Sequence, residues 1–215
     1  MLVKDRMSKH PLTIAEEESI SEAHRYMQEQ KVQHLPVLNK AGDMVGIVTD
    51  DDLLKAQPSA VTSLSMWEIH YLLDRVKVRN VMVRDVITTV EDTPVEEAAH
   101  VMLDRTIGCL PVMRGGKLVG IITKNDLLRV FMELFATRQR GVRITMEVLD
   151  RAGELAKVAQ AVANQGGYIS ASGAFLSEHP TMAGMILKVS NVDRQLLVDA
   201  LSQIEGAVLT DVREM

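Results

Sequence analysis

The stretch GIVTDDDLL, residues 46–54, returns almost unchanged as GIITKNDLL, residues 120–128. Each copy reads as the end of a β-branched strand, a polar junction and the start of a helix. The match extends upstream, because Leu-Pro-Val occurs at 35–37 and again at 110–112. The offset is 75 residues there and 74 at the junction, so one residue is missing from the intervening turn of the second copy. A duplicated fold unit is therefore predicted.

The segments 19–30 and 94–105 also align at the longer offset, and each places apolar residues on one helical face. Ser19 and Thr93 are predicted as N-caps, with Pro94 at the first helical position. Each copy is therefore expected to fold as β–α–β–β–α. Two further pairs align at the same offset, Met7 with Met82 and Thr13 with Thr88.

An insert separates the copies, and a different pattern follows the second one. The insert has apolar residues at helical spacing, which favours a packing or dimer helix over a ligand lid; they are Met66, Ile69, Leu72, Leu73 and Val76. A helix is predicted to run from the second junction to Gly141. Beyond it the pattern β–α–β–β–α–β is that of a ferredoxin-like sandwich. The predicted segments are 1–57 (first unit), 58–78 (linker with inserted helix), 79–137 (second unit) and 140–215 (C-terminal domain), in an α/β (α+β) chain.

Composition excludes several classes of function. The 215 residues are 47% hydrophobic and 25% charged, an ordinary globular balance. The net charge of −5 and the 3% aromatic content argue against nucleic-acid binding. No apolar run reaches the roughly 20 residues that span a bilayer, and residues 1–14 lack the apolar h-region that is typical of a signal peptide. Cys109 is the only cysteine and the histidines are scattered, so no metal site is predicted. We expect a cytoplasmic protein without a membrane partner.

The two junctions carry the candidate chemistry. Thr49 and Asp52 match Thr123 and Asp126, three residues apart at a helix N-terminus. Helix capping is one explanation. Capping accounts less well for the glycine that both copies keep three residues before the threonine. In a ligand site the same geometry directs a hydroxyl and backbone N–H groups toward a phosphate, while the carboxylate accepts the hydroxyls of a ribose.

These features resemble a known family. The Gly-x-x-Thr-x-x-Asp junctions, the Leu-Pro-Val strands and the pairing of the units resemble a tandem CBS pair, the Bateman module that senses adenine nucleotides. The C-terminal part, with DRAGEL at 150–155 after its first strand, is similar to an ACT domain. Two CBS units followed by an ACT domain resemble the acetoin-utilisation AcuB-type proteins, and the insert TSLSMWEIHYLL at 62–73 fits them too.

The CBS resemblance implies two binding sites. Asp52 and Asp126 would hold ribose hydroxyls, with Thr49 and Thr123 near ribose and phosphate. The implied adenine pocket of the second unit consists of Thr93, Ala98, Ile107 and Gly108, and that of the first of Glu18, Ala23, Val32 and Gln33. A ligand on Asp126 would face His34 and Asp51, and one on Asp52 would face Cys109 and Asn125. A partly buried structural histidine and a small core cysteine are the alternative readings of His34 and Cys109.

The charges of the residues at the two junctions narrow the range of adenine-type ligands that we expect. The first loop is acidic (TDDD, 49–52), so a polyphosphate near it meets a repulsion of about 1 to 4 kcal/mol per close pair. AMP, adenosine or S-adenosylmethionine is therefore expected to fit better than ATP. Lys124 and Arg129 make the Asp52 site more hospitable to phosphate.

The ACT resemblance implies a weaker second site at Asp150, Arg151 and Gly153. Ala152 and Tyr168 depart from the family pattern, which favours dimerisation over amino-acid binding there. We expect a regulatory, ligand-sensing homodimer that acts on an unidentified partner protein and has no catalytic residues. Two alternatives stay open, namely an enzyme of acetoin breakdown and a constitutive interaction scaffold with vestigial pockets.

Overall fold

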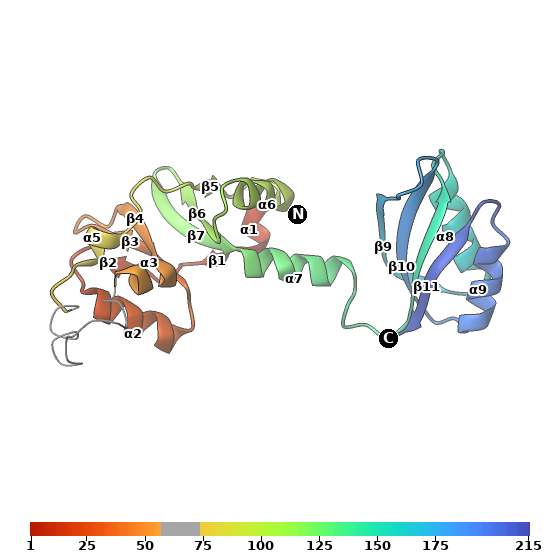
Figure 1. Cartoon of the computed structure of the whole chain (residues 1–215), viewed down its shortest axis with the longest axis horizontal. Coiled ribbons are helices and arrows are strands. Elements are labelled where there is room, and N and C mark those ends of the chain that lie inside the picture. Colours follow the sequence, from red (N-terminus) through yellow and green to blue (C-terminus); the bar gives the residue numbers. More distant parts are fainter. Residues whose placement is uncertain (57–73) are drawn as a thin grey trace. The chain divides into compact units, whose positions relative to one another are not determined.

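The computed structural model describes residues 1–56 and 74–215, which divide into two compact units, Met1–Leu127 and Leu128–Met215 (Figure 1). Most of the helix predicted in the insert, including Met66, Ile69, Leu72 and Leu73, lies outside the described residues. Val76 is described and packs against the core of the first copy. Within the described ranges, no helix is long and apolar enough to cross a membrane.

The first copy folds as predicted. Its order is β2 (Ile14–Ala15), α2 (Ile20–Gln30), β3 (His34–Leu38), β4 (Met44–Thr49) and α3 (Asp50–Lys55), and its sheet has the order β2-β3-β4. Ser19 caps α2, since its hydroxyl accepts the Glu22 N–H at 3.1 Å. The apolar face of α2 packs on the sheet through Ile20, Ala23 and Met27, each at most 2% exposed.

The second copy repeats this order with β5 (Thr89–Val90), α6 (Val95–Asp104), β6 (Cys109–Arg114), β7 (Lys117–Thr123) and α7 (Lys124–Leu134). The predicted capping of α6 was wrong by one residue, because Pro94 is the N-cap and Val95 the first helical residue. The Thr93 hydroxyl instead bonds the Thr89 hydroxyl, at 2.8 Å. Because the Thr93 hydroxyl bonds a residue of β5, it contributes no cap to α6.

The segments that precede each copy cross over to the other copy. After α1 (Val3–Arg6), β1 (Ser8–Lys9) pairs with β7 of the second copy, so that the second sheet has the order β1-β7-β6-β5. After α5 (Val78–Val81), Val83 forms a bridge with Ile47 in β4 of the first copy. The register Ser8↔Ile121 is the repeat equivalent of Val83↔Ile47. The two repeats therefore complete each other reciprocally.

This crossing explains the glycines of the repeated junction. A Cβ added to Gly46 would lie 2.6 Å from Met82 Sδ and 2.8 Å from the Val83 carbonyl oxygen. A Cβ on Gly120 would collide in the same way with Met7 Sδ. Real Cβ atoms do not approach so closely, so only glycine admits the crossing segment. The glycine in each copy is thus required by packing, without any appeal to a ligand.

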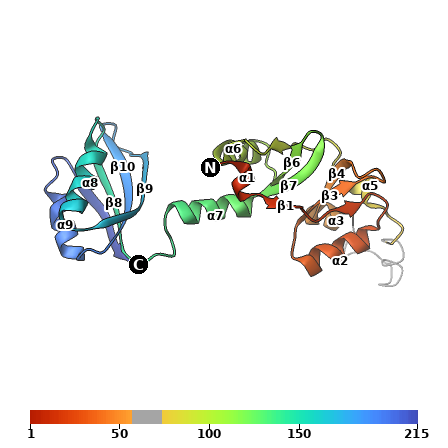
Figure 2. The ribbon, with the colours of Figure 1, turned by 180° about the vertical axis from the view of Figure 1, so that it is seen from behind.

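The C-terminal unit has the predicted order, β8 (Val142–Leu149), α8 (Glu154–Asn164), β9 (Tyr168–Leu176), β10 (Met182–Ser190), α9 (Arg194–Ser202) and β11 (Val208–Glu214). The antiparallel sheet runs β11-β8-β10-β9, and both helices lie on the same face of it (Figure 2). Alternate residues of β8, such as Ile144 and Met146, are buried under these helices. The residues between them, including Arg143 and Thr145, point to the opposite face.

The predicted continuation of α7 to Gly141 was wrong, since the helix ends at Leu134. Ala136 adopts a left-handed backbone with φ of 46°, and the Thr137 N–H bonds the Met132 carbonyl at 3.1 Å. This is the bond pattern with which helices close around a left-handed residue. Sequence reasoning favoured Gly141 because alanine rarely takes that conformation.

Candidate functional site

The first candidate site lies where β4 ends and α3 begins. Thr49 is the N-cap of α3, and its hydroxyl accepts the Asp52 N–H at 3.2 Å. In return Asp52 Oδ2 accepts the Thr49 N–H at 2.9 Å and the Thr49 hydroxyl at 2.7 Å. This reciprocal capping box orients the carboxylate of Asp52 before any ligand is present.

The second site repeats the arrangement with little change. Asp126 Oδ2 accepts the Thr123 N–H at 2.9 Å and the Thr123 hydroxyl at 2.7 Å, and the Asp126 N–H bonds the threonine oxygen at 3.3 Å. Asp126 is 7% exposed, whereas Asp52 is partly exposed. Capping is therefore confirmed for both junctions, and it leaves two oriented carboxylates of the kind that accept paired hydroxyls.

Each loop is anchored to the turn that precedes the Leu-Pro-Val strand. The Asp50 N–H bonds the Gln33 carbonyl at 3.1 Å, and the Lys124 N–H bonds the Gly108 carbonyl at 3.0 Å. Gln33 and Gly108, predicted from the resemblance as pocket residues, thus lie against the capped junctions. The two sites differ in charge at this anchor, because an aspartate begins α3 where a lysine begins α7.

His34 connects the two copies. A Cβ on Gly108 would lie 2.6 Å from His34 Nε2, so the imidazole packs directly on the Gly108 backbone. Burial lowers the pKa of His34 below its usual 6.5, and the positive charge of Lys124 adds to this, against the opposing effects of Asp52 and Asp51. A neutral imidazole therefore lies among the charged groups of both junctions.

Most of the other residues predicted to line the adenine pockets are buried or partly buried. Ala23 and Ala98 have no exposed surface, and Val32 packs against the first core. Thr93 and Ile107 are partly exposed, while Glu18 accepts the Val78 N–H through its carbonyl at 2.9 Å. Their contact with an adenine ring stays a prediction.

Cys109 is a core residue. It is 5% exposed and packs with Ile47 and Ile121, which are repeat equivalents from β4 and β7. Burial raises the pKa of its thiol to about 12, so little thiolate forms at neutral pH. In residues 1–56 and 74–215, no cluster of three or more His, Cys, Asp or Glu side chains is arranged to hold a metal ion.

The loop after β8 contains the three residues predicted from the ACT resemblance. Gly153 takes a left-handed backbone, with φ of 94°, at the N-cap of α8. Arg151 is held by Glu154 at 2.7 Å and by Glu205 at 3.1 Å. Hydrogen bonds from Lys157 and Arg151 lower the pKa of Glu154. Arg151 is therefore committed to ion pairs within the domain, and Asp150 bonds the Thr181 carbonyl through its N–H at 2.9 Å.

Sequence reasoning missed two features. The contacts of Met7 and Met82 with the junction glycines had a signal, namely the equal spacing of the methionines in the repeat. The second feature is a cavity on the open face of the C-terminal sheet. The sequence contained a signal for it as well, since polar residues alternate with buried ones along 142–149. In the sequence analysis this alternation predicted a strand and was not extended to a cavity on its polar face.

Comparison with known proteins gives the family. The CBS domain family matches residues 3–59 and 78–133, more than half of the chain. A CBS domain-containing protein of Dictyostelium discoideum is 32% identical over 135 residues, which are 62% of this chain and 93% of that protein. The L-aspartate semialdehyde sulfurtransferase of Methanocaldococcus jannaschii is 34% identical over 131 residues. That match covers 60% of this chain but only 23% of the enzyme.

Two solved structures are similar to this chain. The CBS domain pair of protein MJ0100, in complex with 5′-methylthioadenosine and S-adenosyl-L-methionine, is 33% identical with a TM-score of 0.51; the match covers 61% of this chain and 99% of that one. A protein of Vibrio cholerae assigned to acetoin utilization (AcuB) is 29% identical with a TM-score of 0.53, and the match covers 64% of this chain and 95% of that one. The chain belongs to the CBS domain family and contains a tandem pair of CBS units.

Proposed function

We propose that the CBS pair is a sensor of adenosine-containing ligands, and that the chain is a regulatory protein rather than an enzyme. The observation that carries this is the duplicated junction, in which each unit presents an aspartate whose carboxylate is oriented by a threonine. The related pair of protein MJ0100 binds S-adenosyl-L-methionine and 5′-methylthioadenosine, which supports an adenosyl ligand here.

In this proposal Asp52 and Asp126 accept the ribose hydroxyls, and Thr49 and Thr123 lie toward the phosphate or its replacement. The adenine rings occupy the pockets named above. His34, which already packs on Gly108, is the contact from the first unit to a ligand of the second. A ligand that touches both units favours one arrangement of the pair by as much as its affinities for the two arrangements differ.

Charge selects among adenosyl ligands. The first turn of α3 contains Asp50, Asp51 and Asp52, so a triphosphate near it is repelled by about 1 to 4 kcal/mol per close pair. A sulfonium group has the opposite sign and is attracted. We therefore expect S-adenosylmethionine and AMP to bind more tightly than metal-free ATP.

For the C-terminal domain we propose an ACT-type role, either in forming a homodimer or in binding a second effector. Its β–α–β–β–α–β order supports this. The internal ion pairs of Arg151 favour the dimer role over an amino-acid site in the loop after β8. The segment limits 1–57, 79–137 and 140–215 are part of the proposal.

The test is calorimetric titration of ligand-stripped protein with S-adenosylmethionine, AMP and ATP. Asp52→Asn and Asp126→Asn keep an acceptor for the capping bonds but remove the carboxylate, and we expect one or both to lose saturable binding. Asp104→Ala, at an exposed position of α6, is the matched control and should bind like the parent chain. Absence of heat from all three ligands, with a native circular-dichroism spectrum, would refute the sensor and favour the scaffold.

A further inference from the structure

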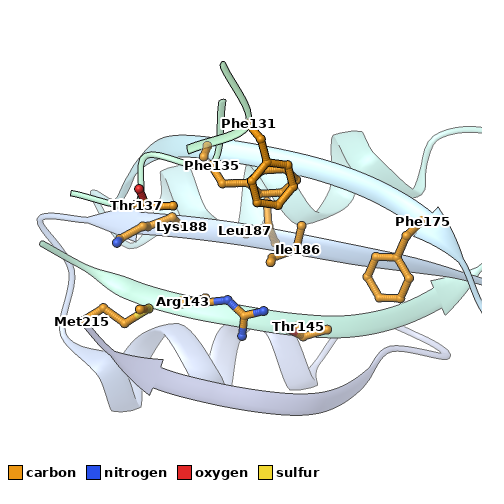
Figure 3. Close-up of a pocket in the computed structure, with 11 residues that line it drawn as sticks. Phe131, Phe135, Thr137, Arg143, Thr145, Phe175, Ile186, Leu187, Lys188 and Met215 are labelled. Atoms are coloured by element: carbon orange, nitrogen blue, oxygen red, sulfur yellow. The ribbon is translucent and has the colours of Figure 1, made fainter. Parts of the chain in front are cut away.

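A cavity of about 440 Å³ lies on the face of the C-terminal sheet that α8 and α9 leave open (Figure 3). All residues around it belong to the unit Leu128–Met215. Its floor is formed by the outward-facing residues of β8, β9 and β10. Phe131 and Phe135 cover it from the end of α7 and the segment that follows, as Figure 3 shows.

One end of this cavity is cationic. In the register of the sheet Lys188 is opposite Arg143, and Arg143 is opposite Arg213. Asp211 pairs with both arginines and accepts from each at 2.7 Å, so its single negative charge leaves the group of cations net positive. Lys188 is 4% exposed, and its ammonium makes no ion pair or hydrogen bond with any described residue. A buried ammonium opposite another cation is costly unless an anion joins them.

A second unsatisfied group lies on the same floor. Thr145, two residues along β8 from Arg143, has its hydroxyl oxygen buried with no hydrogen-bond partner in the described part of the chain. A hydroxyl donates as readily as it accepts. Lys188, Arg143 and Thr145 therefore present donors toward one space, and Asp211, the carboxylate that pairs with Arg143, is shared with Arg213.

The other end is apolar. Phe175 packs over Gly184, and Phe135 packs over Gly173, so the two glycines leave room for aromatic rings on the sheet. Phe131 packs against Phe135 with tilted rings whose centroids are 4.7 Å apart, and Ile186 completes the apolar wall. Phe131 and Phe175 remain 54% and 47% exposed. Apolar surface around a few convergent polar groups is typical of a small-molecule site.

We propose that this cavity binds a monocarboxylate with an apolar body, of the size of a medium-chain fatty acid. The carboxylate lies between Lys188 and Arg143 and accepts from Thr145, while the chain lies under Phe131 and against Phe175. A carboxylate on an apolar body is favoured over inorganic phosphate because the apolar wall of the cavity, with Phe131, Phe175 and Ile186, offers an inorganic ion no contact.

The experiment is calorimetric titration of the full chain with octanoate, with octan-1-ol as the uncharged analogue. We expect one octanoate per chain and at least tenfold weaker binding of octanol. Lys188→Met should weaken octanoate at least tenfold, and Phe175→Ala should weaken both compounds. Lys117→Met, an exposed lysine of the CBS pair, is the control and should leave octanoate binding unchanged.

Circular dichroism establishes that Lys188→Met is folded, which we expect because the substitution removes a buried charge. Absence of saturable octanoate binding at millimolar concentration overturns the proposal, as does equal binding by the parent chain and Lys188→Met. A dimer that Phe175→Glu dissociates, together with no octanoate binding, assigns this face to a second copy and also overturns it. None of these results depends on whether the CBS pair binds adenosyl ligands.

Discussion

Substitution of the junction glycines tests the reciprocal packing of the two copies. In Gly120→Ala the new methyl group collides with Met7 Sδ and lies 3.1 Å from both Met7 Cγ and the Ser8 carbonyl oxygen. Overpacking of this kind costs about 1 to 3 kcal/mol. Most of the overlap is with the end of a flexible side chain, so Met7→Ala should remove it. That substitution alone costs about 1 to 2 kcal/mol in lost burial.

The double variant should therefore be about 1 to 2 kcal/mol more stable than the sum of the single effects. Gly46→Ala behaves differently, because its methyl group also lies 2.8 Å from the Val83 carbonyl oxygen. That oxygen accepts the Ile47 N–H at 2.9 Å, so it cannot move away from the methyl group without breaking this hydrogen bond. Met82→Ala should thus rescue Gly46→Ala by less than about 0.5 kcal/mol.

The assay is urea unfolding followed by circular dichroism, with separate transitions fitted for the two units. Gly115→Ala is the control, since no atom lies within 4 Å of its new Cβ while its φ is 56°. It should cost about 1 to 2 kcal/mol through backbone strain alone and add to Met7→Ala without coupling. A Gly120→Ala variant as stable as the parent chain, or one whose effect simply adds to that of Met7→Ala, would contradict the reciprocal packing.

Three further predictions concern the CBS pair. The pKa of His34 is depressed by burial, so the unfolded chain binds more protons between the folded pKa and 6.5; stability should fall as pH is lowered through this window, and His34→Gln should flatten that part of the profile. An imidazole NMR titration midpoint at or above 6.5 would contradict it. Thr123→Val removes the reciprocal cap of α7 and should cost about 1 kcal/mol, whereas Thr123→Ser should cost less; equal losses in urea unfolding would argue against the cap. Since the pKa of Cys109 is about 12, a thiol reagent at pH 8 should react only as the chain unfolds, and immediate stoichiometric reaction of native protein would be inconsistent with its burial.

The helices and strands of the two copies were predictable because the same sequence pattern occurs twice in the chain. The apolar face of 19–30 and its counterpart, and the two Leu-Pro-Val strands, defined β–α–β–β–α twice, and the structure confirms both. The C-terminal order was predictable from period alone, since Val142, Ile144 and Met146 alternate toward the helices. Capping at Thr49 and Thr123 was also visible, because the three-residue spacing to aspartate is local.

The features that escaped prediction depend on distant contacts. Strand β1 is two residues long, too short for any periodicity, and its partner in β7 lies more than 100 residues away. The end of α7 was wrong because a left-handed alanine at 136 has no sequence signature. Lys188 appeared as one polar residue in an apolar strand, and only the register with Arg143 shows that its charge lacks a partner.

The crossing of Ser8 to Ile121 and of Val83 to Ile47 has a consequence for how such a chain arises. The leading strand of a single repeat does not pair with that repeat's own sheet. A single repeat would therefore complete its sheet only by exchanging leading strands with a second molecule. An ancestral gene with one repeat would therefore encode a strand-swapped homodimer, and duplication would fuse a partnership that already existed. By the same logic a break between residues 56 and 78 does not release two independent modules. We expect two fragments whose sheets are complete only when the fragments associate.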